Sequence, residues 1–238
     1  AMLVEREKKI QQFAAARYFT LELNCGRFRA ESDKIEPLEV EKAASACGKT
    51  ALVKSVVKEQ KNANPPKLYD LTTLQRDANK LFGYTAQQTL DCAQKLYESK
   101  LMTYPRTDSC YLTDDMEQTA LDMVGRTAKA FRFGADYEAQ GCVPDVKRLI
   151  NNDKVSDHHA LLPTKEISRF DFSRLSEECW NVLTLVAARL LLAVSPVHTY
   201  NTVTAVLECG GRDFTARGKT VVQGGWKQLE ATIKAGLK

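Results

Sequence analysis

The sequence predicts an α+β fold in which a mainly helical domain carrying a tyrosine motif is inserted into a two-part, β-rich domain. Segments that alternate apolar and polar residues lie toward both ends of the chain, at 18–25, 52–58 and 202–208. Apolar residues at helical spacing dominate the middle of the chain instead. The predicted boundaries are residues 1–68 and 198–238 for the β-rich domain and residues 69–197 for the helical domain.

Composition is typical of a globular protein with a core. The 238 residues are 44% hydrophobic and 27% charged, with a net charge of +4. No apolar run approaches the ~20 residues that cross a bilayer. We expect a cytoplasmic protein with no membrane contact. Seven cysteines without a CxxC pair argue against a disulfide framework and against a zinc site. The mild positive charge permits a nucleic-acid partner.

The N-terminal third predicts a strand–helix–strand unit. A short helix is expected first, at residues 4–13. A strand follows at residues 18–25 and continues at Phe28. A helix at residues 38–47 ends before Gly48, because glycine is a usual helix stop. A Val-rich strand at residues 52–58 then leads into a polar connector.

The helical middle begins with two short helices. Thr72 or Thr73 is expected to cap the first, which ends at Gly83, and Thr85 is expected to cap the second. The elements expected after them are a helix from Thr113 to about Phe131, irregular chain at 133–156 with a helical turn near 146–150, a buried helix from Ser176 to Pro196, and a hairpin of 202–208 with 213–217.

Tyr104 and Arg106 stand two positions apart, with Pro105 between them. Pro105 favours an extended conformation for Tyr104, and residues i and i+2 of an extended chain project to the same side. The phenol and the guanidinium can then address one phosphate, because arginine offers a planar fork of donors. On spacing alone, a buried tyrosine packed beside a surface arginine is the favoured reading.

Three segments resemble motifs of the type IA DNA topoisomerases, closest to the topoisomerase III branch. They are LMTYPRTDSC at 101–110, PPKLYDLTTLQ at 65–75 and SDHHALLPT at 156–164, and the opening run AMLVERE also fits. They follow the family's order and approximate spacing. The resemblance implies an arch-like fold with the tyrosine-bearing domain set into a two-part β domain. It also implies ATP-independent cleavage and rejoining of one DNA strand.

The resemblance assigns catalytic roles to three residues. Tyr104 is the expected nucleophile, which becomes joined to the 5′ phosphate, and Arg106 is the expected phosphate clamp. His158 is expected near both the phosphate and the tyrosine. Expected DNA contacts are His159, Asp108, Thr107 and Gln75. From the residues alone, the histidines also fit structural or surface roles, Asp108 a loop acid or helix-entry cap, and Gln75 a helix cap.

The resemblance also implies Mg²⁺, held by clustered acids of an N-terminal metal-binding (Toprim) domain. Asp114–Asp115 and Glu177–Glu178 look like helix starts, so no metal site is expected in this chain. We therefore expect a central fragment of a bacterial enzyme, monomeric and unable to relax DNA by itself. Its expected partner is single-stranded DNA or an underwound duplex.

A non-catalytic, helix-turn-helix DNA-binding module is the alternative. Two helices joined at Gly83–Tyr84 have that layout, and Arg76 and Lys80 are available for DNA. A packed helical pair without DNA contact also stays open. A tyrosine recombinase or a relaxase would need separated Arg and His residues or a three-His metal cluster, and neither is visible.

Overall fold

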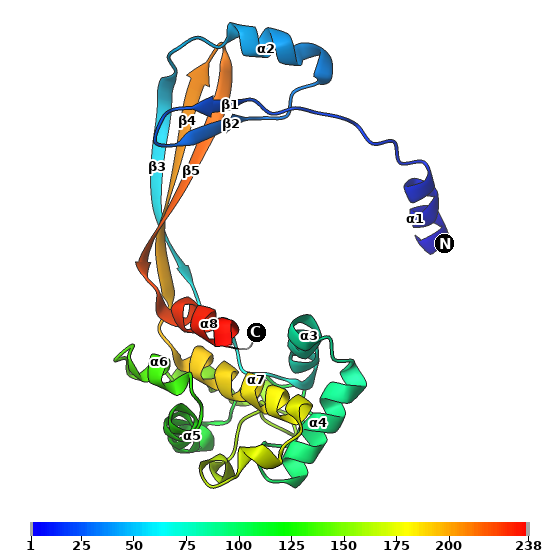
Figure 1. The fold of residues 1–238 in the computed structure, drawn as a ribbon, viewed down its shortest axis with the longest axis vertical. Coiled ribbons are helices and arrows are strands. Elements are labelled where there is room, and N and C mark those ends of the chain that lie inside the picture. Colours follow the sequence, from blue (N-terminus) through cyan, green and yellow to red (C-terminus); the bar gives the residue numbers. More distant parts are fainter. Residues whose placement is uncertain (1, 237–238) are drawn as a thin grey trace. The chain divides into compact units, whose positions relative to one another are not determined.

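The computed structural model describes residues 2–236 (Figure 1). The helices are α1 (Met2–Gln11), α2 (Val40–Ala46), α3 (Leu71–Phe82), α4 (Ala86–Glu98), α5 (Glu117–Ala130), α6 (Gly134–Glu138), α7 (Glu177–Val194) and α8 (Gly225–Gly236). The strands are β1 (Glu22–Asn24), β2 (Arg29–Ser32), β3 (Leu52–Ala63), β4 (His198–Cys209) and β5 (Arg212–Gln223). The predicted α+β class is confirmed, and the helical middle lies between strands.

The chain folds as two compact units. One comprises residues 1–61 and 200–220, and the other comprises residues 62–199 and 221–238. The predicted boundaries placed all of residues 198–238 with the β-rich domain. In the structure, residues after 220 belong to the helical unit instead, because α8 buries Leu229 and Ile233 in its core.

The five strands form one sheet in the order β1-β2-β5-β4-β3. β1 pairs with β2, and β2 with β5, in antiparallel register. A small apolar cluster supports the sheet of the first unit: Ala30, Leu207, Cys209, Phe214 and Ala216. Only part of the sheet is covered, since Val53, Val56 and Val57 of β3 are exposed.

The predicted polar connector after residue 58 is wrong for its first half, because β3 continues to Ala63. The Thr202 hydroxyl donates to the Glu59 carbonyl at 3.4 Å, and the Thr199 hydroxyl to the Asn62 side chain at 3.0 Å. Every residue of β3 before Ala63 is exposed. Polar side chains therefore stay solvated there. A run of polar residues does not mark the end of such a strand.

Three other expectations need correction. The strand predicted at residues 18–25 is regular only over β1, with an isolated bridge between Phe19 and Ile35. The segment predicted as irregular contains α6. The C-terminal helix α8 was not predicted at all, although Leu229 and Ile233 have the i, i+4 spacing of a helix face.

α8 is fixed at its start. Gly225 has φ +51, and a Cβ there would lie 2.4 Å from the Val197 carbonyl oxygen. The Trp226 amide donates to the Pro196 carbonyl at 2.9 Å, and its indole donates to the Ala63 carbonyl at 2.9 Å. The chain therefore turns from β5 into a helix that packs on α7.

α7 is the centre of the helical unit, and it contacts α3, α4, α5 and α8 (Figure 1). As predicted, Ser176 caps it, accepting from the Cys179 amide, and residues 182–194 are buried except for Arg189. Arg189 pairs with Asp77 of α3 and donates to the Tyr69 hydroxyl at 2.8 Å. Burial raises the pKa of Tyr69, so this phenol stays protonated. No helix of the described residues is long and apolar enough to cross a membrane.

The cap of α3 is Asp70, not the predicted Thr72 or Thr73. The Asp70 carboxylate accepts from the Thr73 amide at 2.6 Å, and the Thr73 hydroxyl accepts from the Asp70 amide at 3.2 Å, which completes a capping box. Thr85 caps α4 as predicted, in a second capping box with Gln88. At Thr113 no side-chain cap forms. Instead, Asn152 accepts from the Asp114 amide at 2.9 Å.

We expect Asp70→Ala to lower the free energy of unfolding of the helical unit by about 1 kcal/mol at neutral pH. Burial alone would raise the pKa of Asp70, but the hydrogen bonds from Thr73 outweigh it and lower the pKa overall. The stabilisation is therefore present above the ordinary carboxyl pKa and is lost as the pH falls through the lowered one. Urea unfolding followed by tryptophan fluorescence, from about pH 7 to about pH 3, measures this.

The matched control is Thr85→Ala, which removes an uncharged cap from the next helix. Its cost should be similar at neutral pH and should not change with acid. Equal pH dependence of the two variants would contradict a charge-based role for Asp70.

Candidate active site around Tyr104

The Tyr104 segment is anchored on the core just before the tyrosine. Leu101 and Met102 are buried, and Met102 forms a β-bridge with Pro163. The Thr103 amide donates to the Leu162 carbonyl at 3.0 Å, and the Thr103 hydroxyl accepts from the Leu162 amide at 3.0 Å. The backbone around Tyr104 is therefore held against residues 161–163.

Tyr104 itself is half-buried and packs between two rings. Its ring centroid lies 4.5 Å from that of His158, with 47° between the planes. Tyr97 of α4 meets Tyr104 edge-on at 5.4 Å. Such contacts restrict the orientation of the phenol. The predicted proximity of Tyr104 and His158, which are 54 positions apart, is present in the structure.

Thr107 ties the two motifs together. Its side chain is buried. The hydroxyl donates to the His158 carbonyl at 3.0 Å and accepts from the Ser109 amide at 3.1 Å. Its carbonyl accepts from the Leu71 amide at 3.1 Å. We assigned Thr107 to DNA contact from the resemblance, but its hydroxyl is already engaged in positioning the His158 loop.

A pocket of about 420 Å³ lies beside this junction. It is lined by Leu71, Thr72, Arg106, Thr107, Asp108, Ser156, Asp157 and His158. Arg106 is exposed, and no carboxylate among the described residues forms an ion pair with it. The pocket thus offers an unpaired guanidinium and an imidazole to an anion, with the carboxylates of Asp108 and Asp157 at the same walls.

The same-side argument for Tyr104 and Arg106 does not hold in its simple form. The chain bends at Pro105, and the Thr107 amide donates to the Pro105 carbonyl at 3.0 Å, which closes a three-residue turn around Arg106. His158 is the residue that the two side chains have in common. Tyr104 packs on its ring, and Arg106 lines the pocket that His158 also lines.

Two other predicted DNA contacts are engaged elsewhere. The Gln75 amide nitrogen donates to the Ala86 carbonyl at 3.0 Å and thus links α3 to the start of α4. His159 is half-buried, and its Nδ1 lies 2.7 Å from the Ala160 carbonyl oxygen. Asp108, in contrast, lines the pocket as an exposed residue.

Sequence reasoning missed three side chains near the site. Tyr97 belongs to α4 and to none of the recognised motifs. Lys67 and Tyr111 lie within or next to recognised motifs, but their proximity depends on tertiary folding. The Nζ of Lys67 lies 4.9 Å from the Tyr111 ring centroid. Only the position of Tyr111 seven residues after Tyr104 could have drawn attention to it.

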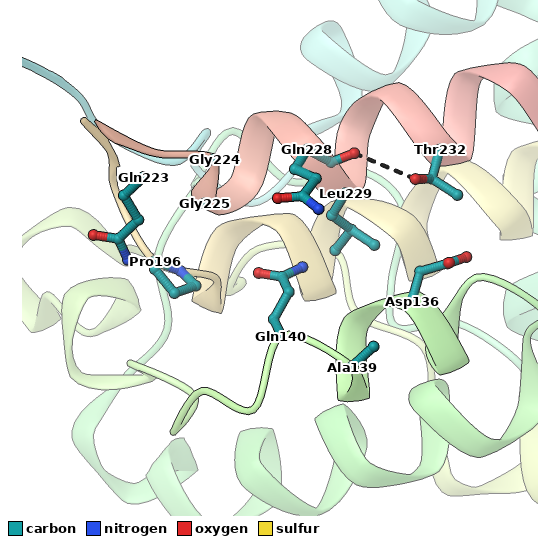
Figure 2. A pocket seen from close by; sticks show the side chains of 10 residues that line it. All are labelled: Asp136, Ala139, Gln140, Pro196, Gln223, Gly224, Gly225, Gln228, Leu229 and Thr232. Atoms are coloured by element: carbon teal, nitrogen blue, oxygen red, sulfur yellow. Dashed lines mark hydrogen bonds between the residues drawn. The ribbon is translucent and has the colours of Figure 1, made fainter. Parts of the chain in front are cut away.

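A second pocket of about 320 Å³ lies where α6 and Pro196 meet the start of α8 (Figure 2). Its polar groups are mostly amides and a hydroxyl, from Gln140, Gln223, Gln228 and Thr232, and Asp136 is its one charged lining residue. No Lys, Arg or His side chain lines it, unlike the pocket beside Tyr104.

No group of three or more His, Cys, Asp or Glu side chains among residues 2–236 could hold a metal ion. The Mg²⁺ implied by the resemblance therefore finds no donor set in the described part of the chain.

Comparisons with known proteins agree on one family. The sequence matches the family model described as DNA topoisomerase over residues 1–236. DNA topoisomerase 3 of Bacillus subtilis (strain 168) is 37% identical over 241 residues, which cover 96% of this chain and 33% of that protein. DNA topoisomerase 3 of Bacillus licheniformis is 38% identical over 240 residues, with the same two shares.

Among solved structures, full-length topoisomerase I from Thermotoga maritima superposes with a TM-score of 0.69 at 21% identity. The match covers 96% of this chain and 38% of that one, and it shows the fold.

The fold is thus that of the type IA topoisomerases, an α+β class with a helical, tyrosine-bearing unit inserted into a β-rich one. The match over residues 1–236 shows that the chain belongs to the type IA DNA topoisomerase family, and its relatives are of the topoisomerase III kind. The chain spans about a third of the length of the curated relatives that it matches. α3 and α4 pack on each other and on α7, and Arg76 and Lys80 are exposed. The family match, and not this packing, favours a topoisomerase over a helix-turn-helix module.

Proposed function

We propose that this chain provides the strand-cleaving tyrosine of a type IA topoisomerase, which cuts and reseals one DNA strand. The observation that carries the proposal is the packing of Tyr104 on His158 at a pocket lined by Arg106. The proposed substrate is single-stranded DNA or an underwound duplex. The proposed setting is the bacterial cytoplasm, with the protein acting as a monomer.

In the proposed reaction the Tyr104 oxygen forms a bond to phosphorus and loses its proton. The bond between phosphorus and the 3′ oxygen of the preceding nucleotide breaks, and that oxygen takes up a proton. The DNA is then joined to Tyr104 through its 5′ phosphate. Because a phosphodiester replaces a phosphodiester, attack by the 3′ hydroxyl reverses the step, and no ATP is needed.

Three side chains assist this reaction in our proposal. A tyrosine phenol is mostly protonated at neutral pH, so the attack needs a proton acceptor or a nearby cation. The His158 imidazole, in contact with the Tyr104 ring, can relay the proton. Arg106 binds the phosphate oxygens and stabilises charge that develops on them. Asp108 supports the site from the pocket wall.

We further propose that metal chemistry comes from a domain outside these residues. In the family that the resemblance identifies, clustered acids hold Mg²⁺, and the described residues contain no such cluster. The share of its relatives that the chain spans, about a third, supports a role as the central part of a larger catalytic assembly.

Relaxation of supercoiled plasmid with Mg²⁺ tests both parts of the proposal. The 238-residue chain alone is expected to relax none. A chimera in which residues 1–236 replace the matching segment of Bacillus subtilis DNA topoisomerase 3 is expected to relax it without ATP. Relaxation by the chain alone would refute the partial role. A chimera that folds, as judged by circular dichroism, but relaxes nothing would refute the assignment of the reaction.

A further inference from the structure

Lys67, Tyr111 and Lys154 form a basic cluster that the proposed reaction does not use. The Nζ atoms of Lys67 and Lys154 lie 4.9 Å and 5.2 Å from the Tyr111 ring centroid. Both lysines are exposed, and Tyr111 is half-buried. Neither ammonium group forms an ion pair with a carboxylate among residues 2–236. Two positive charges are therefore gathered at one phenol without a protein counter-ion.

The electrostatics of the phenol agree with this geometry. A hydrogen bond from Lys67 is the main cause that lowers the pKa of Tyr111, and the charge of Lys154 adds to it. Tyr111 in turn raises the pKa of Lys67, so the ammonium stays charged. The neighbouring Asp70 carboxylate accepts from the Cys110 thiol at 3.4 Å and from the Thr73 amide at the start of α3. It forms no ion pair with either lysine.

The cluster shares its backbone with the Tyr104 pocket. Residues 67–72, 106–111 and 154–158 each contribute to both. The Leu71 amide donates to the Thr107 carbonyl at 3.1 Å, and the Ser109 hydroxyl to the Lys154 carbonyl at 2.7 Å. These hydrogen bonds therefore join the segments that carry the cluster to the segments that line the pocket.

We propose that Lys67, Tyr111 and Lys154 bind a backbone phosphate of the same DNA strand, next to the phosphate that Tyr104 attacks. The inference rests on the proposed function for the identity of the strand. Lysine ammonium groups are phosphate ligands, and the phenol donates a further hydrogen bond. The ammonium groups already lie over the ring, so the cluster reads the backbone and not the bases. Its contribution is independent of base sequence.

Binding of a fluorescent single-stranded oligonucleotide to the Tyr104→Phe chain, over a range of salt concentrations, tests the inference. This background removes covalent capture from the measurement. The double variant Lys67→Gln, Lys154→Gln is expected to bind more weakly and to flatten the slope of log affinity against log salt by about 0.7, the value for one phosphate contact. Tyr111→Phe is expected to weaken binding about threefold to tenfold without changing that slope.

The matched control is Lys129→Gln with Lys147→Gln, which removes the same charge from exposed positions outside the cluster. An equal change of slope in this control, or an unchanged slope in the cluster variant, would overturn the inference, as would the absence of any binding. Tryptophan fluorescence confirms that each variant is folded. If the slope changes as expected but the chimera forms no covalent adduct, the phosphate site stands and the proposed reaction fails.

Discussion

Tyr104→Phe in the topoisomerase chimera is expected to abolish covalent capture of single-stranded DNA. The substitution removes only the phenolic oxygen, which is the atom that forms the bond to phosphorus. The ring that packs against His158 and Tyr97 remains, so the core beneath it is undisturbed. Denaturing gels of the protein with a labelled oligonucleotide measure the adduct, and its loss should be complete within detection.

Tyr97→Phe is the matched control, because Tyr97 is the neighbouring tyrosine in edge-on contact with Tyr104. It should leave the adduct in place. An adduct that persists in Tyr104→Phe would show that another residue is the nucleophile. An adduct whose DNA carries the tyrosine at its 3′ end would contradict the proposed direction of cleavage.

Leu183→Ala is expected to lower the free energy of unfolding of the helical unit by about 3 kcal/mol, since it leaves a cavity in the core. Leu183 lies on α7 and is fully buried, in the cluster that also contains Leu101 and Met102. These two residues immediately precede the Tyr104 turn. Urea unfolding followed by tryptophan fluorescence reports on this unit alone, because Trp180 and Trp226 both belong to it.

Leu81→Ala removes the same atoms from α3, but Leu81 is 41% exposed. Its expected cost is well under half that of Leu183→Ala, because little apolar surface returns to water. Equal losses for the two variants would contradict the assignment of α7 as the centre of the core.

The sequence predicted a helix or strand well where its faces are buried, and poorly where they are exposed or need a distant partner. α7 was predicted from Ser176 to Pro196, because a helix buried on most sides is apolar throughout and its cap is local. β3 was cut short, because both of its faces are exposed and polar residues are tolerated there. α8 was missed because its only apolar signal is a narrow stripe that needs α7 as a partner.

The candidate site divides in the same way. The motif at 101–110 identified Tyr104 and Arg106, and the motif at 156–164 identified His158. The predicted extended geometry is interrupted, because the chain bends at Pro105 and the Thr107 amide donates to the Pro105 carbonyl in a turn around Arg106. Thr107 and Gln75 were predicted to contact DNA, yet their side chains bind the backbone of this chain.

The sequence by itself determined the family, the α+β class, the main buried helix and the three residues proposed for the reaction. These depend on residue types at short spacing, which the chain order preserves. Only the tertiary structure decided that Tyr104 meets His158, and that Lys67 and Lys154 gather at the Tyr111 ring. Contacts between segments about 40 to 90 residues apart depend on how the helical unit packs, and periodicity within one segment carries no information about them.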